Sequence, residues 1–152
     1  MLFIKHYLNS LFLQIWQFYL VLFIFIKPKN ILPINNLRIF YGGSKGGNIG
    51  GPKVKIQKLN NKFPEKFFNF NILYLISNSQ YLTKSTLTLI KEKNIPIFLN
   101  QNGVYYPAWF EGNYSKKNLE MSYAYHLADY VLWQSNFCKK ASDKFLGKRT
   151  GH

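Results

Sequence analysis

The stretch LRIFYGGSKGGNIGGPKVKIQKL, residues 37–59, indicates the fold class of this 152-residue chain. The apolar run 37–41 has the length of a strand, six glycines lie between positions 42 and 51, and Pro52 suits the first turn of a helix. A helix N-terminus after a glycine-rich loop presents free N–H groups, which favour an anion. This order is typical of doubly wound α/β proteins, which bind ligands at the carboxyl ends of their strands. The alternative is a flexible surface loop of small residues.

The spacing of the glycines narrows the range of nucleotide-binding motifs that this loop could form. Neither G-x-G-x-x-G nor G-x-x-x-x-G-K-[ST] can be placed on residues 42–51. The sequence therefore disfavours the dinucleotide-binding fingerprint and the P-loop.

The rest of the chain alternates strand and helix patterns. We expect strands at 71–76, 95–99 and 130–133, and helices at 53–61, 83–94, 118–129 and 135–146. This alternation predicts an α/β domain with a parallel sheet and right-handed crossovers. The loops 42–51, 77–80, 100–107 and 134–135 should then gather at one sheet edge and form a ligand site.

Composition limits the partners and cofactors. The formal net charge is +14, but lysine supplies 18 of the 20 basic residues. Since arginine is the preferred reader of phosphates and guanine edges, we expect no nucleic-acid partner and interpret the charge as a general bias. Cys138 is the only cysteine, so the chain has no intrachain disulfide. We expect neither a metal site nor a bound cofactor.

The N-terminal segment is a candidate membrane anchor. Residues 7–26 carry no charge, and a helix of that length crosses a bilayer core of roughly 30 Å. Three readings stay open: a spanning helix, an interfacial helix with His6, Ser10, Gln14 and Gln17 as its polar stripe, and a buried core helix. The predicted organisation is an anchor at 1–26, a linker at 27–36 and a globular domain at 37–152.

The charge distribution predicts an anionic membrane surface as a partner. Residues 1–64 contain nine Lys or Arg and no Asp or Glu. If the helix spans, Lys27, Lys29 and Arg38 outnumber Lys5, and the positive-inside rule puts the globular part in the cytoplasm.

Three motifs resemble a known family. They are GGP at 50–52, NQNGVYYPAW at 100–109 and AYHLADYVLWQSNFCKKASDKFLG at 124–147. With their order and spacing, residues 37–151 resemble the N-terminal half of a GT-B glycosyltransferase of retaining family 4. The resemblance implies a Rossmann-like acceptor-side domain, a nucleotide-sugar donor as co-substrate and an envelope or lipid-linked glycan as acceptor.

The resemblance also suggests site residues. They are Gly50, Gly51, Pro52, Lys53, Asn102, Gly103 and Tyr106, all as substrate-binding residues. Many family members carry a His-Gly pair where Asn102-Gly103 stands, so no catalytic residue is assigned.

The family's second domain, which grips the nucleotide, has no counterpart in these residues. We therefore expect a truncated enzyme that is inactive or nearly so by itself. The alternative is a non-catalytic, membrane-tethered α/β module that binds an anionic ligand or a partner.

Overall fold

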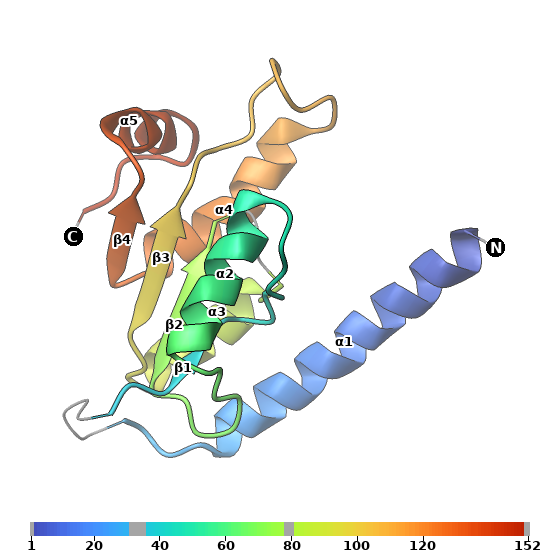
Figure 1. The fold of residues 1–152 in the computed structure, drawn as a ribbon, viewed down its shortest axis with the longest axis vertical. Coiled ribbons are helices and arrows are strands. Elements are labelled where there is room, and N and C mark those ends of the chain that lie inside the picture. The colour runs from blue at the N-terminus through green and yellow to red at the C-terminus, as the bar shows by residue number, and fades with distance from the viewer. Residues whose placement is uncertain (1, 31–35, 78–80, 151–152) are drawn as a thin grey trace.

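A four-stranded parallel sheet forms the centre of the protein (Figure 1). The structure is a computed structural model, and it describes residues 2–30, 36–77 and 81–150. Its elements, in chain order, are α1 (Leu2–Ile26), β1 (Ile39–Phe40), α2 (Gly51–Lys62), β2 (Ile72–Ile76), α3 (Lys84–Glu92), β3 (Ile97–Gln101), α4 (Tyr114–Leu127), β4 (Tyr130–Trp133) and α5 (Asn136–Phe145). The α/β class, the parallel sheet and the N-terminal apolar helix are thus confirmed.

Side chains of β2 alternate between two apolar clusters on opposite faces of the sheet. Leu73 and Leu75 belong to the main core, together with Leu87 and Ile90 of α3 and residues of α1 and α4. Ile76 belongs to a second core, in which it packs with Ile56 of α2 and Tyr41. Because both faces are covered, β2 is apolar along its length, as expected for a central parallel strand.

One crossover has the unexpected hand. The strand order is β1-β2-β3-β4, so each connection advances in the same direction. However, α2 covers one face, whereas α3 covers the other. Figure 1 shows α2 in front of the sheet while the strand order runs leftward, which makes the β1–α2–β2 unit left-handed. The prediction of right-handed crossovers is therefore wrong for this unit.

The position of α1 gives a physical reason for this exception. Leu20 and Ile24 of α1 are fully buried in the main core, on the face that α3 also covers. With α1 there, the apolar side of α2 is left with the opposite face, where Ile56 is buried. The sequence pattern predicts which side of each helix is apolar, but it does not predict which face of the sheet another helix already covers.

Tyr41 ties the end of β1 to the chain after α2. Its side chain is 1% exposed, its hydroxyl donates to the Phe63 carbonyl oxygen at 2.9 Å, and its backbone N–H donates to Glu65 Oε1 at 2.9 Å. Burial, and secondarily the charges of Glu65 and Tyr74, raise the pKa of Tyr41 to about 12.

This pKa predicts an alkaline loss of stability. The unfolded phenol ionises near its usual value of 10.0, whereas the folded phenol resists ionisation until about 12. The stabilisation by neutral Tyr41 is therefore complete below pH 10.0 and is lost as the pH rises through about 12. With allowance for solvent screening, the free energy of unfolding lost over this range is roughly 1–2 kcal/mol.

Tyr41→Phe should flatten this alkaline decline, while it costs about 1 kcal/mol at neutral pH through the lost hydrogen bond. Urea unfolding midpoints measured across the alkaline range check this expectation. Tyr130→Phe, at a tyrosine that is 48% exposed, serves as the control. An equally steep decline in Tyr41→Phe and the wild type would contradict the assignment.

Candidate functional site

The carboxyl edge of the sheet brings the loops after three strands into contact. The backbone N–H of Ser77 donates to the Asn100 carbonyl oxygen at 3.1 Å, and the N–H of Asn102 donates to Ser77 Oγ at 3.1 Å. After β4, the N–H of Gln134 donates to the Gln101 carbonyl oxygen at 3.4 Å. The predicted gathering is thus confirmed for Ser77 and for the loops that begin at residues 100 and 134. Residues 78–80 lie outside the described residues, and these contacts do not include the glycine loop at 42–51.

Lys55 is the charged centre of this edge on the α2 side of the sheet. Its ammonium donates to Asn100 Oδ1 at 3.0 Å and to Asn102 Oδ1 at 3.3 Å. Asn100 Nδ2 donates to the Tyr74 hydroxyl at 3.1 Å. The four side chains thus form one hydrogen-bonded group, which we call the Lys55 cluster, and it contains no carboxylate.

Burial sets the electrostatics of the Lys55 cluster. Removal from water lowers the pKa of Lys55 and raises the pKa of Tyr74, the latter opposed by the Asn100 hydrogen bond. Both neutral amides present their oxygens to the ammonium, and no carboxylate of the described residues forms an ion pair with it. An ammonium has three donors, and within the described part of the chain only two of them are used, so the third can serve an anion.

Local structure explains why Lys55 lies there. Pro52 stands at the start of α2, and Ile56, one turn later, is buried against the sheet. The neighbouring position, Lys55, lies beside this buried side of the helix and reaches the end of β3. Side chains alternate along β3, so Asn100 shares a face with Phe98, opposite Leu99 and Gln101.

A second group of predicted residues lines a pocket of about 310 Å³. Asn102, Gly103 and Tyr106 contribute to this pocket, which we call the aromatic pocket, together with Trp109 and Cys138. Trp109 is 53% exposed and stacks on Tyr105 with ring centroids 5.0 Å apart. The structure therefore brings three of the seven predicted site residues together.

Hydrogen bonds to α4 hold the loop of the aromatic pocket. Asn118 is 4% exposed, and its amide accepts from the Tyr105 N–H at 2.9 Å and donates to the Tyr105 carbonyl oxygen at 2.7 Å. The indole N–H of Trp109 donates to the Val104 carbonyl oxygen at 3.2 Å. The aromatic surface is thus fixed in place and partly open to solvent.

The other four predicted residues lie at the N-terminus of α2 and are not among those that line the aromatic pocket. Gly50 is the N-cap with φ of 87°, and Gly51, Pro52 and Lys53 follow in the first turn. A Cβ built on Gly51 would meet no atom within 4 Å, so the loop is open at this point. Lys53 is exposed, and it is Lys55 that reaches the strand ends.

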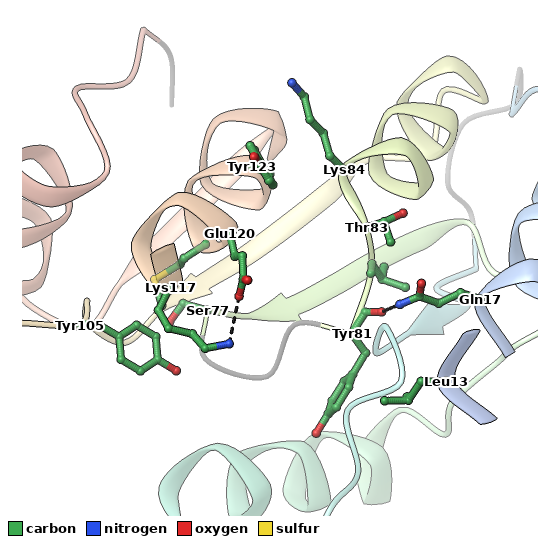
Figure 2. A pocket seen from close by; sticks show the side chains of 12 residues that line it. Leu13, Gln17, Ser77, Tyr81, Thr83, Lys84, Tyr105, Lys117, Glu120 and Tyr123 are labelled. Atoms are coloured by element: carbon green, nitrogen blue, oxygen red, sulfur yellow. Dashed lines mark hydrogen bonds and ion pairs between the residues drawn. The ribbon is translucent and has the colours of Figure 1, made fainter. Parts of the chain in front are cut away.

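A larger pocket of about 450 Å³ adjoins the aromatic pocket and shares Ser77, Tyr105 and Met121 with it. Figure 2 shows Leu13 and Gln17 of α1 on one side and Lys117 and Glu120 of α4 on the other. Lys117 Nζ lies 3.0 Å from Glu120 Oε2, so this carboxylate is already paired.

Other reactive side chains have structural partners. His126 Nε2 lies 2.7 Å from the Leu146 carbonyl oxygen, and the Cys138 thiol donates to the Asn102 carbonyl oxygen at 3.1 Å. Within residues 2–30, 36–77 and 81–150, no three His, Cys, Asp or Glu side chains form a group that could hold a metal ion.

Comparisons with protein-family models, with curated proteins and with solved structures find no match to this chain. The chemistry of the site is therefore that of a partly buried lysine on the helix after a glycine loop, with an aromatic pocket next to it. Lys55 was not predicted from the sequence as a site residue. The sequence does contain a pattern that points to it: Lys55 directly precedes Ile56 on a helix whose apolar positions are 54, 56 and 59, so it lies next to the side of the helix that faces the sheet.

Proposed function

We propose that this chain is the acceptor side of a GT-B glycosyltransferase with a Rossmann-like domain, associated with the cytoplasmic face of a membrane. The reaction would transfer a sugar from a nucleotide sugar to an envelope or lipid-linked glycan. The observation that carries the proposal is the aromatic pocket, in which Asn102 and Tyr106 stand beside the exposed ring of Trp109. Flat apolar rings with a few fixed polar groups suit the faces and hydroxyls of a sugar.

The Lys55 cluster would serve the leaving group. In sugar transfer the bond between the anomeric carbon and the diphosphate breaks, and the acceptor oxygen forms the new bond. Negative charge then grows on the diphosphate. A preorganised ammonium and the N–H groups at the start of α2 would stabilise that charge without reorganising.

A Trp109 substitution tests the sugar-binding part of the proposal. Saturation-transfer NMR with a panel of envelope oligosaccharides should detect binding to the wild-type chain. Trp109→Ala should weaken it by about fivefold to tenfold, which corresponds to the loss of one aromatic stacking partner. Because Trp109 is 53% exposed but donates one hydrogen bond to Val104, its removal should cost only about 1 kcal/mol of stability, so the variant should stay folded.

Phe68→Ala is the matched control, since Phe68 is a 72% exposed aromatic residue outside the aromatic pocket. It should bind the same oligosaccharides as the wild type does. The proposal fails if no oligosaccharide binds, or if both variants weaken binding equally.

A second function is favoured by one feature of the Lys55 cluster. Its four side chains include an ammonium, two amides and a phenol but no carboxylate, so they can hold an anion without repelling it. This composition suits a non-catalytic, membrane-tethered module that binds an anionic ligand or partner. Anion binding without any saccharide binding would favour this function.

A further inference from the structure

The two sides of helix α1 differ in their contacts. One side faces the domain: Leu20 and Ile24 are fully buried, and a Cβ on Gly43 would come within 2.8 Å of the Trp16 ring. The opposite side is exposed and apolar. Its large exposed side chains include Leu8, Leu11, Phe12, Ile15, Phe18, Tyr19, Leu22, Phe25 and Ile26. They recur every three or four positions and form one continuous stripe, which we call the α1 stripe.

The α1 stripe differs from the surface of a core helix. The segment Leu8–Ile26 is long and apolar enough to cross a membrane, and only 11% of its apolar window is buried in the protein. Figure 1 shows the N-terminal part of α1 extending away from the sheet, and residues 8–15 are all exposed. An exposed apolar surface of this extent marks an interaction site.

Polar contacts also fix α1 against the domain. The Gln17 amide donates to the Tyr81 carbonyl oxygen at 2.7 Å, as Figure 2 shows, and Lys93 Nζ donates to the Phe25 carbonyl oxygen at 2.6 Å. A spanning orientation surrounds a helix with lipid on all sides. It would break both bonds and expose the apolar surface that Leu20 and Ile24 cover.

We propose that α1 lies along an anionic lipid surface, with the α1 stripe in the apolar boundary and the domain held on the same side. This inference refines the proposed membrane association and does not depend on sugar transfer. The charge pattern supports lipid as the occupant: residues 1–64 carry nine Lys or Arg and no acidic residue, and Lys27 and Lys29 directly follow the stripe. Apolar burial together with attraction to anionic lipid is how interfacial helices bind.

Vesicle flotation measures the role of the stripe. The full chain should float with vesicles of phosphatidylcholine and phosphatidylglycerol. The triple variant Ile15→Ser, Phe18→Ser, Leu22→Ser should reduce the partition coefficient by about tenfold or more. These three side chains are 48%, 66% and 49% exposed, so the domain should stay folded, which circular dichroism verifies.

The matched control replaces three exposed apolar residues outside α1. They are Ile49, Leu119 and Leu132, which are 85%, 57% and 50% exposed. Their serine variants should bind vesicles as the wild type does. Equal binding by the stripe variant and the wild type would overturn the proposal. It would also be overturned if the wild type dimerised without binding vesicles and the stripe variant were monomeric, because the occupant would then be a second copy.

A fluorophore distinguishes an α1 helix that lies on the membrane from one that spans it. The label is attached to the variant Asn9→Cys, in which Cys138→Ala removes the other cysteine. A lying helix keeps residue 9 on the outer side of sealed vesicles, where added dithionite should quench the label. A spanning helix would protect it, and protection would refute the inference. A label at Asn36→Cys, which is exposed and follows the helix, should be quenched in either orientation.

Discussion

Replacing Gly42 with alanine is expected to lower the free energy of unfolding by about 3–5 kcal/mol, a large effect for a single substitution. Gly42 follows β1 and has φ of 65°, a left-handed conformation that costs an L-residue roughly 1–2 kcal/mol. In addition, a Cβ at this position would lie 2.5 Å from Leu75 Cδ2. Leu75 is 1% exposed in the main core, so it has little room to move.

Substitutions at two other glycines separate the free-energy cost of the backbone conformation from the cost of the clash with Leu75. Gly50 has φ of 87° but nothing within 4 Å of its Cβ position, so Gly50→Ala should show only the backbone cost of roughly 1–2 kcal/mol. Gly103 has open space and no left-handed φ, so Gly103→Ala should change stability by less than about 1 kcal/mol. Urea unfolding of the three variants measures these differences. If Gly42→Ala were no less stable than Gly50→Ala, Gly42 would not pack against Leu75 as described.

The sequence predicted the order of elements well because apolar runs and caps are local signals. The strand Tyr130–Trp133 lies where its apolar run predicts it, and Ser135 accepts from the Cys138 N–H as the predicted N-cap of α5. Element ends were less well predicted. β1 spans only Ile39–Phe40 of the predicted 37–41, because the length of an edge strand depends on its neighbour.

Competition between helices for one face of the sheet explains a feature that the sequence could not predict. The hand of the β1–α2–β2 unit depends on α1 occupying the other face, and no periodicity within 51–62 records that. The same limit applies to the site. Lys53 and Lys55 look alike in sequence, but only the packing of Ile56 directs Lys55 toward Asn100 and Asn102.

The prediction with the largest effect on binding concerns these two lysines. Pyrophosphate is a suitable probe, because it resembles the diphosphate of a nucleotide sugar and needs no second domain. Lys55→Met keeps the aliphatic stem but removes the charge, so pyrophosphate binding measured by calorimetry should weaken by about tenfold or more, as expected for the loss of a charge-assisted hydrogen bond. Lys53→Met should weaken it by less than about threefold, since an exposed, screened charge contributes little.

The pH dependence of pyrophosphate binding tests the role of Lys55 independently. Burial lowers the pKa of Lys55 below the ordinary 10.5, so the free protein loses this ammonium at a lower pH than it loses an ordinary exposed lysine. The affinity of the wild type for pyrophosphate should therefore fall as the pH rises through the lowered pKa. Lys55→Met should lack this step, whereas Lys53→Met should keep it. Equal losses of affinity in the two variants, or a pH step that persists in Lys55→Met, would mean that the anion binds by general charge and that Lys55 is not its specific ligand.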